Sequence, residues 1–427
     1  MRRLQVLALG LATLLAGTSA AVAQTTVVMW SFLDPARSSP REVALREMIQ
    51  AFERANPTIR IRVEPQDFAQ MPPRFFLGHR TGNNPDLVFI DAKNLGGLSQ
   101  SGAAADLAPL VTSRWSAADQ ADIFVTAGLE AARQGSRVLA LPLFHGASVI
   151  YYRKDLFRAA GIDAASITTW DALLEAARRL TRMRDGRVET WGFGVPLSPE
   201  KTESTPLLIR LIEGQRPLFD GCRPRWANPI GAAALRYTAE LITQARVAPR
   251  ESLTLNVDDI TDQFAAGRYA MAISSSLRMS GIQRAATFNK DEIGILPWPS
   301  IEQGAAAPMP VSGWWIAAWA RSPRLNEAAR FIDFMQSPEG ARFWAVTGGQ
   351  VPTRRSLLED PFFRAPEQAW VGTMVSAWGR GSWMEPTECN TRTMQSILNE
   401  AVHRVIVQNT DPMAALTEAE RRFTEAQ

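Results

Sequence analysis

The chain has 427 residues, and its 46 Lys and Arg against 43 Asp and Glu leave a formal net charge of only +3. This near balance, without a run of basic residues, gives no electrostatic footprint for binding nucleic acid. Because a chain of this length exceeds what one hydrophobic core usually supports, about 250–300 residues, we expect two domains.

The N-terminus predicts export. Residues 1–3 give a short positive start, residues 4–16 form an apolar run, and Ala21-Val22-Ala23 offers a small-x-small cleavage site. A membrane anchor would need about 18 apolar residues, and glycine and hydroxyl side chains interrupt this stretch. We therefore predict a cleaved signal peptide over residues 1–23. No cysteine stands at the cleavage site to accept a lipid, so we expect a periplasmic protein that is free in solution.

Export also bears on the two cysteines of the chain. In an oxidising compartment Cys222 and Cys389 could form a disulfide. Their Cα atoms would have to come within about 7 Å, which the sequence cannot show. The pairing therefore stays open at this point.

The first part of the exported chain alternates strands and helices. A compact apolar strand is predicted over residues 26–30 and a helix over residues 45–52, where apolar residues recur at helical spacing. Further strands are predicted over residues 59–63 and 86–90, each bounded by a turn that contains Asn and Pro. Strands separated by helices favour a parallel α/β layer. Ligands bind such layers at the carboxyl ends of the strands, so residues 31–34 and 91–94 are candidates for a cleft.

The rest of the chain predicts a second α/β unit and a helical tail. Thr169 is typical of a helix N-cap, since Trp170, Leu173, Ala177 and Leu180 then share one helix face. Short predicted strands cover residues 138–141, 148–152, 192–195, 269–273, 293–296 and 314–319. A helix over residues 325–335 and an amphipathic tail over residues 394–423 complete the pattern.

Several segments share their order and spacing with one known family. They are residues 51–57 (AFERANP), 84–89 (NPDLVF), 96–102 (GGLSQSG), 141–142 (LP), 151–157 (YYRKDLF), 160–161 (AG), 169–174 (TWDALL), 264–271 (FAAGRYAM) and 328–334 (AARFIDF). In this order, and behind an export signal, they make the chain resemble the extracellular solute-binding proteins of ABC importers. The resemblance is to the carbohydrate-binding group, which includes maltose-binding and glycerol-3-phosphate-binding proteins.

The resemblance implies a fold and a mode of action. The fold would be α/β with two lobes, each a mainly parallel sheet flanked by helices, joined by a hinge of several strands. The N-terminal lobe would comprise residues 24–145 and 312–350, and the C-terminal lobe residues 146–311 and 351–427. A monomer would close on a small-molecule ligand and then dock on an ABC permease in the inner membrane.

Family binding residues follow the first and third strands of the N-terminal lobe. In this sequence the matching residues are Trp30, Ser31 and Asp34, and then Asp91, Lys93 and Asn94. Carboxylates can accept hydrogen bonds from sugar hydroxyls, and a tryptophan can stack on a sugar ring. The alternative for each is a solvated loop residue or a core tryptophan.

Two departures from maltose binders matter. Where those relatives have an acidic residue in the first hinge, this chain has Gly146 beside His145, both of which we expect near the ligand. Where the relatives have a stacking tryptophan, this chain continues through Ser274 and Ser275 to Leu277. We therefore expect that the maltodextrin pocket is not reproduced, and that the two serines supply hydrogen-bond donors instead.

Three residues at the later hinge segments are further candidates. Trp314 and Trp315 could provide a stacking platform from the other side of the cleft, although core packing is the alternative. Arg354 could bind a carboxylate, a phosphate or a pair of hydroxyls, or could form a salt bridge at the rim. If Arg354 reached the cleft together with Lys93 or Arg278, the ligand would be anionic, as in glycerol 3-phosphate or a glycerophosphodiester.

Other function classes find less support. A periplasmic glycosidase would need two carboxylates about 5–10 Å apart, which Asp34, Asp67 and Asp91 could supply. However, the sequence has no nucleophile elbow and no phosphate-cradling glycine loop, and its three histidines share no metal-ligand spacing. We predict a binding protein for a sugar or sugar-like solute, without enzymatic activity, metal or cofactor. Whether it serves import or a sensor stays open.

Overall fold

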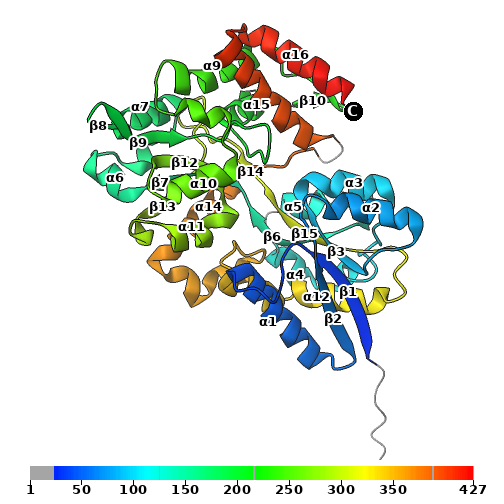
Figure 1. Cartoon of the computed structure of the whole chain (residues 1–427). Helices are drawn as coiled ribbons and strands as arrows, with labels where there is room; N and C mark the ends of the chain where they lie inside the picture. The colour runs from blue at the N-terminus through cyan, green and yellow to red at the C-terminus, as the bar shows by residue number, and fades with distance from the viewer. Residues whose placement is uncertain (1–23, 125, 215–216, 387–388, 427) are drawn as a thin grey trace, which may run out of the picture.

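The computed structural model describes residues 24–426 except 125, 215–216 and 387–388. The predicted signal peptide lies outside the described residues. Within them, most buried apolar side chains fall into two large clusters, each built on its own five-stranded sheet. Figure 1 shows the result as two lobes, with the sheet of each lobe flanked by helices.

The sheet of the N-terminal lobe has the strand order β2-β1-β3-β15-β6. Its strands are β1 (Thr25–Ser31), β2 (Ile59–Pro65), β3 (Leu87–Asp91), β6 (Leu141–Gly146) and β15 (Ser312–Ala318). The first three pair in parallel, whereas β15 runs antiparallel to both β3 and β6. Alternate residues of β1 (Val27, Met29 and Ser31) point into the core, which is the pattern of a strand.

The sheet of the C-terminal lobe has the strand order β13-β7-β12-β9-β8. Its strands are β7 (Ser148–Arg153), β8 (Arg182–Arg184), β9 (Arg187–Gly194), β12 (Tyr269–Ser275) and β13 (Ile293–Leu296). Only β12 and β9 pair in parallel. The α/β, two-lobed fold is confirmed, but the sheets are mixed rather than mainly parallel. A parallel neighbour needs a long crossover, and strands such as β7 and β15 enter from the other lobe without one.

The helices cover the faces of both sheets (Figure 1). In chain order they are α1 (Pro40–Ala55), α2 (Met71–Thr81), α3 (Leu95–Ser101), α4 (Ala117–Asp122), α5 (Thr126–Glu130), α6 (Lys154–Ala159), α7 (Trp170–Leu180), α8 (Pro206–Gly214), α9 (Pro229–Thr243), α10 (Val257–Ala265), α11 (Met279–Ala285), α12 (Leu325–Gln336), α13 (Pro338–Arg342), α14 (Ala369–Arg380), α15 (Thr391–Gln408) and α16 (Pro412–Glu425). The predicted cap of α7 is present, because the Thr169 hydroxyl accepts from the backbone N–H of Ala172 at 3.2 Å. The predicted helical tail is two helices, since the chain turns at Asn409, which has a positive φ.

The chain passes between the lobes along strands that touch one another. Only Ala147 separates β6 in one sheet from β7 in the other. The short strand β14 (Met309–Pro310) pairs with β16 (Ser382–Trp383), and one residue later the chain enters β15. An isolated bridge joins His145 to Val351. We call residues 144–147, 309–313 and 349–354 together the crossing; the residue boundaries predicted for the lobes stay a prediction.

One glycine of the crossing is required by its surroundings. Gly313 has φ 144°, which other residues rarely adopt. A Cβ at this position would also lie 2.3 Å from the carbonyl oxygen of Phe144. The tight pairing of β15 with β6 therefore depends on the absence of a side chain here.

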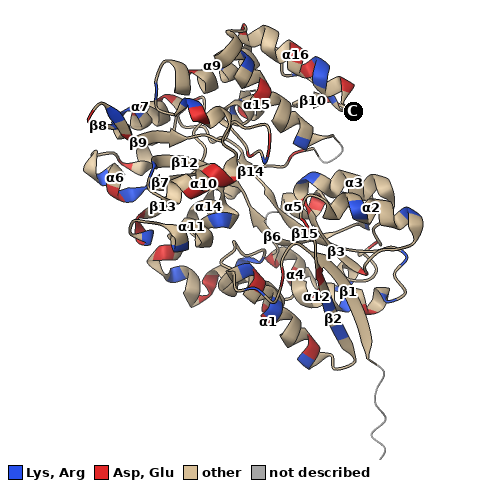
Figure 2. Cartoon of the chain, in the orientation of Figure 1, with Lys and Arg blue, Asp and Glu red and all other residues tan. Residues whose placement is uncertain are grey.

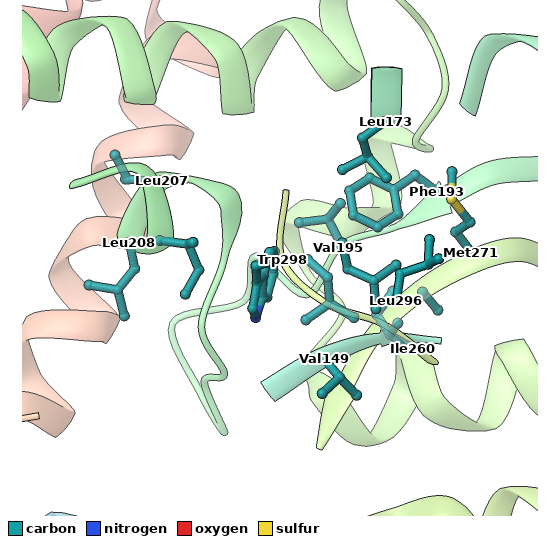
Figure 3. Packing of buried hydrophobic residues seen from close by; sticks show 14 of the residues in the cluster. Val149, Leu173, Phe193, Val195, Leu207, Leu208, Ile260, Met271, Leu296 and Trp298 are labelled. Carbon is teal, nitrogen blue, oxygen red and sulfur yellow. The ribbon is translucent and has the colours of Figure 1, made fainter. Parts of the chain in front are cut away.

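Most tryptophans serve the cores. Trp170, Trp226, Trp315 and Trp344 are among the largest fully buried side chains. In the C-terminal lobe, Figure 3 shows Trp298 in one core with apolar residues from β7, β9, β12 and β13. An excess of tryptophan is therefore weak evidence for sugar stacking in this chain.

The two cysteines are paired. The Cα atoms of Cys222 and Cys389 are 5.3 Å apart and a disulfide joins their sulfurs. The bond ties the hairpin formed by β10 (Phe219–Asp220) and β11 (Arg223–Pro224) to the segment that leads into α15. That segment and α15 supply several residues of the candidate site.

Charged residues are spread over the outside of the molecule. Figure 2 shows acidic and basic residues interspersed on the outer helices of both lobes. Among the described residues, no helix is both long and apolar enough to cross a membrane.

Candidate functional site

The loop after β3 reaches across to the C-terminal lobe. The ammonium group of Lys93 donates to the side-chain oxygen of Gln395 at 2.9 Å and to the backbone oxygen of Thr202 at 3.4 Å. Asp91, at the end of β3, accepts from the Asn94 amide and lies 3.6 Å from the Arg392 guanidinium. The three residues predicted here therefore lie together, and two of them, Asp91 and Lys93, meet partners from α15.

Two carboxyl groups of the C-terminal lobe complete this region. Burial raises the pKa of Glu203 and of Glu385, and the charge of Lys93 partly opposes the shift in both. Gln395 donates to Glu385, while its oxygen also accepts from the Thr202 hydroxyl at 2.7 Å. We call Asp91, Lys93, Asn94, Thr202, Glu203, Glu385, Arg392 and Gln395 the interlobe cluster. It offers donors and acceptors from both lobes at the carboxyl end of β3.

The residues predicted at the end of β1 and in the loop after it make hydrogen bonds within the N-terminal lobe. The Trp30 indole donates to Glu64 at 2.9 Å, and the fully buried Ser31 hydroxyl accepts from the backbone of Leu33 at 3.0 Å. Asp34 accepts from the backbone of Ala36 at 2.9 Å, as in an Asx turn. Phe32, which was not predicted, is the side chain of this loop that packs on Trp314.

The tandem tryptophans of β15 have different surroundings. Trp314 is 9% exposed, and its ring centroid lies 4.1 Å from that of Phe32. Trp315 is fully buried, and its indole donates to the backbone oxygen of Gly128 at 2.8 Å. Trp314 with Phe32 therefore forms an apolar surface beside the interlobe cluster, because Trp314 pairs with Asp91 in the sheet. Trp315 belongs to the core.

His145 and Gly146 are buried at the crossing, with other residues packed closely around them. The His145 ring is fully buried, 5.8 Å from the ring of Trp315, and a Cβ at Gly128 would meet it at 2.2 Å. Burial lowers the pKa of His145 to about 4, which an interaction with the Ser312 backbone offsets only in part. A Cβ at Gly146 would lie 2.5 Å from Leu277. The two predicted departures from maltose binders are thus in contact, since Leu277 occupies the space that a larger residue at 146 would need.

The hydroxyl groups of the two serines that end β12 make hydrogen bonds within the C-terminal lobe. Ser274 is 1% exposed, and its hydroxyl lies 2.6 Å from that of Thr261. The Ser275 hydroxyl accepts from the backbone of Leu277 at 3.4 Å. We expected free donors here, but the end of β12 is buried and its polar atoms need internal partners. Neither serine is carried into the proposed site.

Arg354 forms the salt bridge that the sequence left as its alternative role. It is 3% exposed, with its guanidinium 3.1 Å from Asp122 and 3.4 Å from Asp119. It also donates to the backbone oxygen of Gln336 at 2.7 Å. These partners hold the third crossing segment against α4, so Arg354 is not carried into the proposed site.

None of the five residues that the C-terminal lobe contributes to the interlobe cluster was predicted from the sequence. Thr202, Glu203, Glu385, Arg392 and Gln395 come from loops and from the first turn or so of α15. No motif marks them, and their link to Lys93 spans 109 to 302 residues of sequence. Among the described residues, no group of three or more His, Cys, Asp and Glu side chains is arranged to hold a metal ion.

A second interlobe feature is a cavity with a volume of about 230 Å³. Its walls come from the start of α1 in one lobe and from α10 and α11 in the other, with Arg41 and Arg278 among the lining side chains. Leu277, which contacts the crossing at Gly146, also lines it. The cavity therefore lies where the two lobes meet.

Comparison with known proteins agrees with this geometry. The family described as "Bacterial extracellular solute-binding protein" matches residues 38–342. The sn-glycerol-3-phosphate-binding periplasmic protein UgpB of Salmonella paratyphi A is 25% identical over 364 residues, 82% of this chain and 80% of that protein. UgpB of Escherichia coli K12 is 23% identical over 363 residues, 83% of this chain and 79% of that protein.

Solved structures share the two-lobed fold. Maltose-bound T. maritima MalE3 has a TM-score of 0.77 at 20% identity, covering 94% of this chain and 100% of that one. UgpB from Mycobacterium tuberculosis in complex with glycerophosphocholine has a TM-score of 0.75 at 19% identity, covering 94% of this chain and 98% of that one. With the family match, the fold and the interlobe geometry in agreement, the chain belongs to the bacterial extracellular solute-binding proteins.

Proposed function

We propose that this protein captures a small, hydroxyl-rich solute between its lobes in the periplasm and delivers it to an ABC permease. In this proposal residues 1–23 are a cleaved signal peptide, the protein is an unanchored monomer, and it performs no chemistry on the solute. The lobes comprise residues 24–145 with 312–350, and 146–311 with 351–427. Relatives named for sn-glycerol 3-phosphate and a neighbour bound to maltose support a solute of this class.

The contact of Lys93 with Gln395 and Thr202 carries the proposal. It joins the loop after β3 to the opposite lobe, at the carboxyl edge where α/β sheets bind their ligands. A solute placed here would bring the lobes together by touching both. Closure of two domains around a ligand is a common hinge motion, and the short links of the crossing are suited to it.

The chemistry of the interlobe cluster suits a polyhydroxylated solute. Carboxylates accept hydrogen bonds from hydroxyls, and the Lys93, Asn94 and Arg392 side chains donate to them. The aromatic pair of Phe32 and Trp314 offers an apolar face for C–H groups. Leu277 beside Gly146 supports a small solute rather than a maltodextrin.

A thermal-shift panel of neutral sugars, polyols and glycerol phosphates tests the proposal. We expect at least one class to raise the melting temperature of the exported protein, because a ligand that binds only the folded state stabilises it. The solute should be recovered unchanged. Lys93→Met should reduce the shift in melting temperature, whereas Lys290→Met, at an exposed position in a short 3-10 helix, should leave it intact. Release of a hydrolysis product would contradict the proposal and favour a hydrolase. Native mass spectrometry of co-purifying solute extends the search beyond the panel.

A further inference from the structure

The interlobe cavity beside Leu277 is rich in arginine. Its titratable lining side chains are Arg41 from the N-terminal lobe and Asp262, Arg278 and Arg284 from the C-terminal lobe. Three cations therefore face a single carboxylate across a space of about 230 Å³. Cations gathered around a cavity repel one another unless an anion lies between them.

Arg41 lines the cavity from the N-terminal lobe. It lies in the first turn of α1, partly buried, with its guanidinium carbon 5.4 Å from the centre of the Phe32 ring. Among the described residues its side chain makes no ion pair or hydrogen bond. Burial, and next the positive charge of Arg278, lower the pKa of Arg41 to about 10, and the negative charge of Glu42 opposes this shift only in part. A guanidinium that is partly desolvated and close to a second one has the environment of an anion site without its anion.

Arg278 is only partly neutralised. Its guanidinium lies 2.5 Å from Asp258, but Asp258 also pairs with Lys201 at 2.7 Å. One carboxylate therefore serves two cations. Glu203 is a second acidic neighbour of Arg278, and burial raises the pKa of Glu203.

The two arginines approach from opposite lobes. Arg41 moves with α1 of the N-terminal lobe, and Arg278 precedes α11 of the C-terminal lobe (Figure 1). Their repulsion opposes closure when the cavity holds no anion. An anion between them would turn that repulsion into attraction for both lobes, and planar guanidinium groups bind phosphate and carboxylate oxygens in pairs.

We propose that this cavity binds the anionic group, a phosphate or a carboxylate, of the captured solute, with Arg41 and Arg278 holding it from opposite lobes. The inference rests on the proposed function and narrows it to anionic, hydroxyl-rich solutes. The rest of such a solute would extend past Phe32 and Trp314 toward the interlobe cluster.

Titration calorimetry of the exported protein with matched solutes tests this site. The pairs are glycerol 3-phosphate against glycerol and glucuronate against glucose, with glycerophosphocholine as a phosphodiester and inorganic phosphate as the bare anion. We expect an anionic member to bind at least 100-fold more tightly than its neutral counterpart. The phosphate and carboxylate arms distinguish the two chemical sources of the charge.

Variants then assign the binding to the cavity. Arg41→Gln and Arg278→Gln should each weaken the anionic solute at least tenfold, and Arg278→Lys keeps a charge for Asp258 if the glutamine variant does not fold. Arg54→Gln, exposed on the last turn of α1, removes the same charge from the same helix and should change nothing. Thermal melting by circular dichroism checks that each variant is folded.

Two results would overturn the site, and they are distinguishable from failure of the proposed function. If the neutral member of a pair binds as tightly as its anionic counterpart, the anion site is wrong and solute capture stands. The same holds if an anion binds equally well to Arg41→Gln and to the native protein. If no panel member binds and none co-purifies, the proposed function fails and the anion site fails with it.

Discussion

The crossing and the interlobe cluster both carry charged and polar side chains, but they use them differently. At the crossing, His145 is fully buried, and Arg354 forms salt bridges with two aspartates and a hydrogen bond with a backbone oxygen. In the interlobe cluster, Lys93 and Asp91 meet partners of the opposite lobe. A polar residue at the crossing therefore holds the lobes in place, whereas one at the carboxyl end of β3 stays available to a solute.

Truncation of Trp315, the core tryptophan of β15 whose ring packs against His145 of the crossing, should have the largest effect on stability. Trp315→Ala removes a fully buried indole and its hydrogen bond to Gly128, so we expect a loss of about 4 kcal/mol in the free energy of unfolding. Urea denaturation measures it. Trp191→Ala, at a partly buried position on β9, is the control and should cost less. A loss below about 1 kcal/mol for Trp315→Ala would break the distinction between the two regions.

The crossing should also respond to acid through His145. The unfolded chain binds this proton below pH 6.5, whereas the folded protein binds it only below about pH 4. The free energy of unfolding should therefore fall as the pH drops from 6.5 toward 4, by about 3 kcal/mol from this residue. Chemical denaturation of the native protein and of His145→Gln is measured across this pH window. The difference between their free energies of unfolding gives the contribution of His145. Equal pH slopes would show that His145 is not buried as a neutral ring.

Removing the disulfide should affect both the stability of the protein and the interlobe cluster. Cys222→Ser with Cys389→Ser should lower the free energy of unfolding by about 2–3 kcal/mol and weaken solute binding, because the bond anchors the segment that carries Glu385. Thermal melting and calorimetry measure both. A reductant should reproduce the loss in the native protein and do nothing further to the double variant. Full retention of affinity would separate the disulfide from the site.

Ser274 should give the smallest effect. Ser274→Ala removes the hydrogen bond to Thr261 and should cost about 1 kcal/mol of stability. Since this hydroxyl lies in the lobe interior, solute affinity should not change by more than about twofold. A tenfold loss of affinity in calorimetry would return Ser274 to the binding site.

Much of the fold could be predicted because its signals are local. The strand predicted over residues 26–30 is β1 (Thr25–Ser31), and the helix cap at Thr169 is present. Two lobes followed from the chain length and from the family resemblance. The directions of β7 and β15 could not be read in advance, because they depend on which lobe the chain comes from and not on hydrophobic periodicity.

Only the part of the candidate site that belongs to the N-terminal lobe could be predicted from the sequence. Asp91, Lys93 and Asn94 follow a buried strand, and the rule for carboxyl ends of parallel strands applies to them. Arg392 and Gln395 sit on an amphipathic helix with no motif, and only tertiary folding brings them to Lys93. His145 and Arg354 were expected near the ligand because they lie at the predicted hinge segments, and the structure places both side chains in buried surroundings.

A crystal structure with the panel solute that binds most tightly tests the central claim most directly. The account predicts one solute between the lobes, in contact with Lys93 and Gln395 and with Arg41 or Arg278 on its anionic group. A solute bound to the outer surface, or wholly within one lobe with no group of the interlobe cluster in contact, would contradict it.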